Sequence, residues 1–311
     1  MPFNPNVKLT RENIKHLPPM LTDGAWGTEM QKLGAKPGQM CDLWNVEQPE
    51  KVYSVAKSYV DAGSNIILTN TFNSNRIVLA KHGLEARVAE LSRAGAEISR
   101  RAAAGKAYVF ASLGPTGKLV MIGDAEPEEI REVYAEQAAA LAAGGADALV
   151  VETQSDSGEA AAALNGCLKA CGLPVGVSFT FDSGAGGDRT MMGVSIEQAY
   201  KVAAENGASF VGANCGAGIE SFVKLASRFA ACGDDMPIWI KGNAGKPEVD
   251  SAGSTVYKAS PQAYSDVVDA LLAAGASFIG GCCGSTPLHI KAMADKLASR
   301  DIACGPGCGC R

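Results

Sequence analysis

The chain alternates short apolar runs with longer segments of helical periodicity, and this alternation continues along almost its whole length. Apolar residues that recur every three or four positions are typical of helices, whereas short continuous apolar runs are typical of buried parallel strands. The pattern predicts eight strands, at 20–23, 65–72, 107–113, 148–153, 174–181, 208–214, 237–241 and 277–281. The clearest helical segments between them are 49–62, 84–104, 127–143 and 196–206.

A glycine lies within three residues of the start of four predicted strands, at Gly63, Gly145, Gly207 and Gly275. Each fits the position just after a helix where the backbone turns left-handed, which glycine adopts at least cost. The same βα unit is therefore repeated, and eight such units predict a single (β/α)8 TIM barrel. A doubly wound open sheet is the alternative. It is disfavoured because no G-x-G-x-x-G follows the first strand.

The length of 311 residues is compatible with one barrel domain. We expect a single domain over 1–311, with its core at about 18–300 and a Cys-rich tail, DIACGPGCGCR, at 301–311. Apolar residues make up 47% and charged residues 20%, as in a globular chain with ample core. The formal net charge of −5 argues against a nucleic-acid partner and favours a small molecule.

The N-terminal segment has no apolar run with a cleavage site, and no apolar stretch approaches the ~20 residues that cross a bilayer. We therefore expect no membrane partner and a cytoplasmic location. Ten cysteines in a reducing compartment indicate thiols or metal ligands and not a disulfide framework.

Three cysteines follow predicted strands, which is where barrel enzymes place their reacting groups. Cys215 in VGANCG follows the sixth strand, and Cys282 and Cys283 in IGGCCG follow the eighth. Three thiolates converging on one ion would form a zinc site with one open tetrahedral position. The alternative is three buried thiols, because free cysteine is often buried.

The other cysteines lack this placement. We interpret four of them as structural: Cys41, Cys167, Cys171 and Cys232. Cys304, Cys308 and Cys310 leave open a second soft-metal cluster in the tail. The tail alone does not supply four ligands.

Polar and small residues at strand ends are candidate substrate contacts. They are Asp23, Gly24, Ala25, Thr69, Asn70, Asn73, Glu152 and Asn243. Glu152 can accept hydrogen bonds from a substrate ammonium, with a solvated loop carboxylate as the alternative. The small residues Gly24 and Ala25 allow exposed N–H groups to receive a carboxylate. Asn243 either faces the open metal position or stabilises a turn.

The motifs DGAWGTEMQKLG, TNTFNSN, GPTGK, VVETQSD, GANCG, GNAGKP and GGCCGSTPLHI resemble, in order and spacing, the homocysteine S-methyltransferase family. The similarity covers about residues 18–298 and is greatest to the homocysteine-binding module of cobalamin-dependent methionine synthase. It implies that Cys215, Cys282 and Cys283 bind Zn²⁺, that the Asp23–Ala25 segment contacts homocysteine, and that Glu152 binds its amine. The implied reaction transfers a methyl group to the homocysteine thiol and gives methionine.

The methyl donor is left open between a small molecule, such as betaine or S-methylmethionine, and a separate methyl-corrinoid protein. By the same resemblance, the betaine-using enzymes carry a tyrosine at the position that Asn73 occupies here, and betaine is therefore disfavoured. Trp44 either faces a cationic methyl group or seals the barrel mouth.

The same residues leave other functions open. They are a zinc-thiolate enzyme acting on a different thiol, methyl exchange with a corrinoid protein, and a metal-binding or redox module. A Ser-His-Asp hydrolase is disfavoured, because the sequence has no G-x-S-x-G turn and no histidine at a strand end.

Overall fold

The computed structural model describes residues 3–234, 236–249 and 255–303, so the tail cysteines Cys304, Cys308 and Cys310 lie outside the described residues. Its main sheet has eight parallel strands in the spatial order β1-β10-β7-β6-β5-β4-β3-β2. The strands are β1 (Met20–Leu21), β2 (Ile66–Ile67), β3 (Tyr108–Leu113), β4 (Ala148–Gln154), β5 (Val175–Phe179), β6 (Phe210–Gly218), β7 (Ile238–Asn243) and β10 (Ala276–Gly281).

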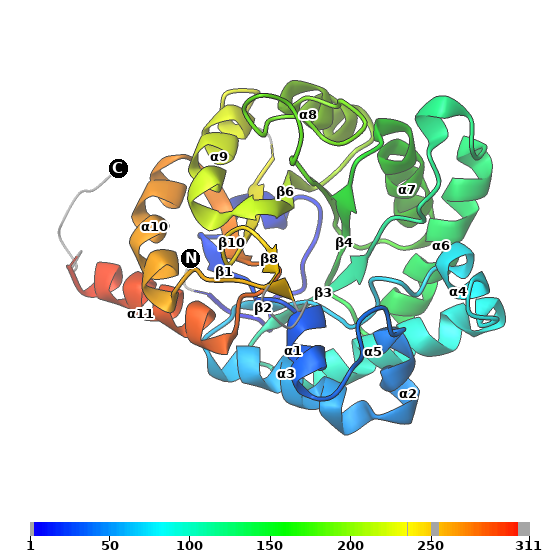
Figure 1. Ribbon diagram of the computed structural model, residues 1–311, viewed down its shortest axis with the longest axis horizontal. Coiled ribbons are helices and arrows are strands. Elements are labelled where there is room, and N and C mark those ends of the chain that lie inside the picture. The colour runs from blue at the N-terminus through cyan, green and yellow to red at the C-terminus, as the bar shows by residue number, and fades with distance from the viewer. Residues whose placement is uncertain (1–2, 235, 250–254, 304–311) are drawn as a thin grey trace.

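Helices surround the strands on the outside (Figure 1). They are α1 (Gly27–Lys32), α2 (Trp44–Glu47), α3 (Pro49–Asp61), α4 (Arg76–Ala80), α5 (Val88–Ala103), α6 (Pro127–Ala143), α7 (Ser157–Ala170), α8 (Ile196–Glu205), α9 (Phe222–Ala230), α10 (Pro261–Ala273) and α11 (Pro287–Ala303). The TIM barrel prediction is confirmed, and the doubly wound sheet is excluded. No helix in the described part of the chain is both long and apolar enough to cross a membrane.

The sheet closes between β1 and β2 through Asn65. The Asn65 side-chain oxygen accepts a hydrogen bond from the Leu21 N–H at 2.9 Å, and the Asn65 N–H donates to the Leu21 carbonyl at 2.8 Å. The Asn65 carbonyl in turn accepts from the Tyr108 N–H at 2.8 Å. One residue therefore connects the first three strands at the amino-terminal end of the barrel.

All eight predicted strands are present, and the four glycines predicted to follow helices have φ values between 72° and 102°. The second strand is much shorter than the predicted 65–72, and the sixth continues beyond the predicted end. A small antiparallel pair, β8 (Glu248–Val249) and β9 (Thr255–Val256), was not predicted.

Aromatic rings fill the lower interior of the barrel. Phe110, Phe210, Trp239 and Phe278 come from four different strands, and their ring centroids lie 5.5–6.2 Å apart. Gly176 leaves the space for one of them, because a Cβ there would lie 2.1 Å from the Phe210 ring. The interior is thus a packed floor, and any ligand site must lie above it, at the carboxyl ends of the strands.

We predict that Asn65→Ala lowers the free energy of unfolding by about 1–3 kcal/mol, because it leaves the Leu21 N–H without its acceptor at the seam. Urea denaturation followed by circular dichroism measures the change. Asn165→Ala, on the exposed face of α7, is the matched control and should change stability by less than about 0.5 kcal/mol. Equal effects of the two substitutions would refute a special role for Asn65 in closing the barrel.

Candidate active site

A cavity of about 490 Å³ opens above the aromatic floor, at the carboxyl ends of the strands. The alternation of side chains along each strand determines which residues reach it. Residues two positions beyond a floor residue again point inward, so Ser112 follows Phe110 and Lys241 follows Trp239. Glu152 reaches the cavity in the same way from β4.

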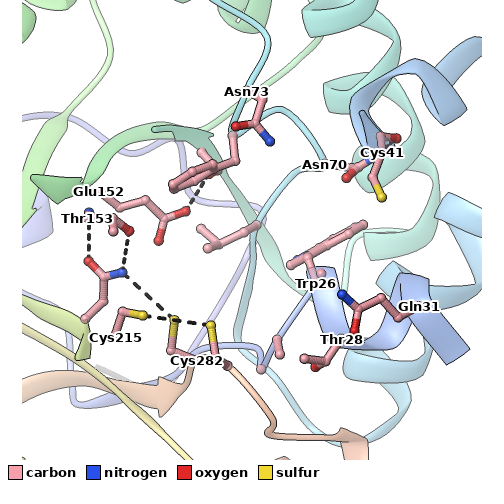
Figure 2. A pocket seen from close by; sticks show the side chains of 18 of the residues that line it. Trp26, Thr28, Gln31, Cys41, Asn70, Asn73, Glu152, Thr153, Cys215 and Cys282 are labelled. Carbon is pink, nitrogen blue, oxygen red and sulfur yellow. Dashed lines mark hydrogen bonds between the residues drawn. The ribbon is translucent and has the colours of Figure 1, made fainter. Parts of the chain in front are cut away.

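The three candidate metal ligands come together at this level of the barrel. Cys282 lies four residues beyond Phe278 and therefore keeps the inward direction. Cys215 follows the inward Asn214 and reaches the cavity because its φ of 62° turns the chain, where the β6–β7 register also shifts. Gly284, with φ of 79°, turns the chain after Cys283. Figure 2 shows Cys215 and Cys282 on the same side of the cavity.

The geometry of these thiols fits a metal. The sulfurs of Cys215, Cys282 and Cys283 all lie within 4.8 Å of one another, and those of Cys215 and Cys283 are 3.8 Å apart. A tetrahedral zinc with bonds of about 2.3 Å separates two sulfur ligands by about 3.8 Å. The trio therefore matches the spacing and the soft donor set of a three-thiolate site.

The same cysteines cannot all ionise by themselves. Hydrogen bonds from Cys282 and Cys283 lower the pKa of Cys215 to about 3. The hydrogen bond with Cys215 raises the pKa of Cys283 to about 12, and it also raises the pKa of Cys282 well above its ordinary value. One thiolate held by two thiols is the state that the protein alone supports, and a bound cation is what would release the other two protons.

Asn214 supports this arrangement from behind. Its side-chain oxygen accepts from the Thr153 N–H at 2.9 Å and from the Ser178 hydroxyl at 2.6 Å. Its amide nitrogen donates to the Thr153 hydroxyl at 2.8 Å and lies 4.0 Å from the Cys282 sulfur (Figure 2). Sequence reasoning missed Asn214, although its inward position two residues beyond Gly212 was a usable signal.

Glu152 is buried in the cavity wall beside this network, directly before Thr153 (Figure 2). Its Oε1 accepts a hydrogen bond from the Ser112 hydroxyl. Burial raises the pKa of the Glu152 carboxyl to about 7, while the Ser112 hydrogen bond and the charge of Lys241 act in the opposite direction. The group therefore changes charge near neutral pH, and a cationic partner in the cavity would favour its ionised form.

Asp23 lies behind the cavity wall, not in it. It is 0% exposed, and its Oδ2 accepts from the Leu68 N–H at 2.7 Å and from the Trp26 indole N–H at 2.8 Å. The Lys241 ammonium donates to its Oδ1 and, at 2.9 Å, to its backbone carbonyl. Lys241, a charged residue in the apolar strand IWIKGN, was a signal that sequence reasoning overlooked.

Gly24 and Ala25 do line the cavity. The Ala25 N–H donates to the Ser285 hydroxyl at 3.1 Å, and the Tyr59 hydroxyl donates to the Ala25 carbonyl at 2.6 Å. Gly24 must be glycine at this packing density, because a Cβ would lie 2.8 Å from both Ser285 and Tyr59. The segment is thus fixed rigidly against the Cys282–Ser285 turn.

Thr69, Asn70 and Asn73 also line the cavity, and Asn70 and Asn73 lie on the side away from the cysteines (Figure 2). The Thr69 hydroxyl accepts from the Ser112 N–H at 3.0 Å. The Asn70 amide donates to the Cys41 carbonyl at 2.8 Å, and the Asn73 N–H donates to the buried Asp42 carboxylate at 2.8 Å. Their positions are therefore held by hydrogen bonds to the wall.

Asn243 is buried at the end of β7, where its hydrogen bond lowers the pKa of Cys215. Its Oδ1 has no partner among the described residues. Its backbone carbonyl accepts from the Gly245 N–H at 2.8 Å, so the turn noted from the sequence is present as well. Asn243 is not among the residues that line the cavity, and it contacts the trio from behind.

Two sequence-based interpretations change. Trp44 is 2% exposed and does not line the cavity, and the cation over its ring is Lys51, at 4.5 Å. Trp26 is the tryptophan in the cavity wall. Cys41, interpreted as structural, lies in the wall on the side away from the cysteine trio (Figure 2).

Comparison with known proteins identifies the family. The model of the family described as homocysteine S-methyltransferase matches residues 20–297. The methionine synthases of Mycobacterium tuberculosis and Mycobacterium leprae are each 30% identical over 90% of the chain, which spans about a quarter of their length. The metallated homocysteine methyltransferase MmuM of Escherichia coli shares the fold, with a TM-score of 0.76 and 23% identity over 91% of this chain and 98% of its own.

The family match over most of the barrel, including the segments that carry the three convergent cysteines, shows that the chain belongs to the homocysteine S-methyltransferase family.

Proposed function

We propose that this protein transfers a methyl group to the thiol of homocysteine and gives methionine, with Zn²⁺ held by Cys215, Cys282 and Cys283. The observation that carries the proposal is the convergence of three sulfurs beside a buried carboxylate in one cavity. The family membership and the relatives named methionine synthase support homocysteine as the acceptor. The single barrel domain over 1–311 remains part of the same proposal.

The bound zinc would supply the positive charge that keeps a fourth, substrate thiol deprotonated and nucleophilic at neutral pH. The protein's own residues bind and orient the acceptor. Glu152 receives the ammonium of the substrate, and Gly24 and Ala25 lie beside the carboxylate of the substrate. Thr69, Asn70 and Asn73 complete the cavity wall, and the methyl donor would approach on the side of Asn70 and Asn73 (Figure 2).

Asp23 and Asn243 serve this site from behind the wall. Asp23 holds Trp26 and Lys241 in place, and Asn243 contacts the sulfur of Cys215. Asp23 and Asn243 therefore act on the proposed substrate and metal sites indirectly, through the residues that line the cavity.

The donor is either a small molecule or a separate methyl-corrinoid protein. One observation favours the protein donor. Six of the seven exposed large apolar residues in the described chain lie on segments that follow the carboxyl ends of strands: Leu33, Met121, Ile122, Met191, Val249 and Leu288. Exposed apolar side chains at the end of the barrel where the cavity opens would suit contact with a protein donor.

A direct assay tests the function. Purified, reduced, zinc-loaded protein is incubated with homocysteine and, separately, with betaine, S-methylmethionine or methylcobalamin, and methionine is measured. We expect methionine with at least one donor other than betaine. Methylation of other thiols but not of homocysteine would support the alternative acceptor. Metal binding with no methylation of any thiol would support a metal-binding module.

We predict that Cys215→Ser loses the metal, because two cysteines do not replace a three-thiolate site. Metal content measured by atomic emission should fall from about one zinc per chain to near zero. Cys41→Ser, in the same cavity but outside the trio, is the matched control and should keep the zinc. Full zinc content in Cys215→Ser would show that the trio is not the metal site.

We predict that Glu152→Gln weakens homocysteine binding by about 1.5–3 kcal/mol, the range of a charge-assisted hydrogen bond, while zinc content stays unchanged. Glutamine keeps one acceptor oxygen and nearly the same shape, so the change removes the charge and replaces the second acceptor oxygen by an NH2 group. Isothermal titration of the zinc-loaded variant measures the loss. Wild-type affinity in this variant would exclude Glu152 as the amine ligand.

The raised pKa of Glu152, about 7, gives a pH dependence with a defined sign. Below pH 7 the free protein carries a neutral carboxyl that attracts an ammonium weakly, and above pH 7 it carries the carboxylate. The ratio of wild-type to Glu152→Gln affinity should therefore rise as pH increases from 6 towards 8. The substrate thiol loses its proton on binding to either protein, so this contribution to the pH dependence cancels in the ratio. A ratio independent of pH would contradict the assignment.

A further inference from the structure

Lys241 is a buried cation in the cavity wall. It is 1% exposed, and its ammonium lies 5.6 Å from the ring of the floor residue Trp239. Lysine is rarely buried without an ionic partner, and here the partner is Asp23 on the first strand segment. Lys36, the other basic residue lining the cavity in the described chain, is exposed.

The Lys241 ammonium lies at the end of the cavity that Gly24 and Ala25 line. Two of its three N–H groups donate to Asp23, one to the carboxylate and one, at 2.9 Å, to the backbone carbonyl. That carbonyl belongs to the peptide group that joins Asp23 to Gly24, so the positive charge lies beside the Gly24–Ala25 segment. Glu152 stands on β4, three strands away from β7 in the sheet order.

Asp23 does not compete for a substrate cation. Its Oδ2 already accepts two N–H groups, and its Oδ1 accepts from Lys241. Asp23 accepts two of the three N–H groups of Lys241, so a third N–H can meet a ligand anion on that side of the cavity, while Glu152 can meet a ligand cation from β4. Charges act more strongly on each other in a site of low dielectric than in water.

Resting on the proposed function, we propose that Lys241 determines which end of the acceptor binds where. Its charge attracts the acceptor's carboxylate to the Gly24–Ala25 side, while Glu152 takes the ammonium. The cavity thereby selects thiols that carry both groups of an α-amino acid over thiols that carry the ammonium alone. Lys241 is a specificity-determining residue that takes no part in methyl transfer.

The test compares three thiols on the zinc-loaded protein by isothermal titration. They are homocysteine, γ-mercaptobutanoate, which has the carboxylate without the amine, and γ-mercaptopropylamine, which has the amine without the carboxylate. Lys241→Met should weaken the first two by about tenfold, the effect of losing one favourable charge interaction, and leave the third unchanged or tighter. An equal loss for all three thiols, or no loss for any, would overturn the proposal.

A double variant protects the test against misfolding. Lys241→Met alone leaves the buried Asp23 without its cation, which destabilises proteins strongly, whereas removing both charges together is often tolerated. Asp23→Asn with Lys241→Met should therefore melt close to the wild type and show the same loss of preference for the carboxylate. Asp23→Asn alone leaves Lys241 unpaired and should tighten γ-mercaptobutanoate.

The outcomes separate this inference from the proposed function. Wild-type protein that binds none of the three thiols overturns both. Protein that binds homocysteine, but whose double variant keeps the wild-type preference for the carboxylate, overturns the role of Lys241 alone.

Discussion

Every second side chain of a strand in a closed barrel points into the same narrow interior, and the site depends on this constraint. The lower interior positions carry Phe110, Phe210, Trp239 and Phe278, whose rings fill the space completely enough to form a floor. The next inward positions cannot also be large and apolar without filling the cavity. They are polar instead, and the depth of the floor sets how far the cavity reaches.

Several groups near that level can carry negative charge, which creates an electrostatic conflict. Glu152 and Asp23 are buried, and the three cysteines are half-buried. The protein resolves the conflict in part through Lys241, which pairs with Asp23, and through a Glu152 pKa of about 7. Among the three thiols, the pKa values favour ionisation of Cys215 alone. No cation in the described part of the chain is paired with this thiolate, so the binding of a cation beside it is favoured.

The sequence was sufficient for the strands and for the convergence of the three cysteines, because both follow from local pattern. A buried strand shows as an apolar run, and Cys215, Cys282 and Cys283 stand at the ends of two such runs. The roles of Asp23 and Trp44 were harder to predict. Asp23 pairs with a lysine 218 positions away, and no local pattern indicates which buried charge meets which. Trp44 is buried by helices that pack around it, and Trp26 takes the position in the wall.

Backbone strain connects the two halves of the site. Thr153 and Cys215 are not glycine, yet their φ values are 64° and 62°, a conformation that costs about 1–3 kcal/mol and persists only where neighbours enforce it. Asn214 enforces it at Thr153 by bonding both the backbone N–H and the hydroxyl, and it directly precedes Cys215. Thr153 directly follows Glu152. One buried amide therefore links the strand end that carries the Glu152 carboxyl to the strand end that carries the Cys215 sulfur, and it limits how far these two groups can move apart.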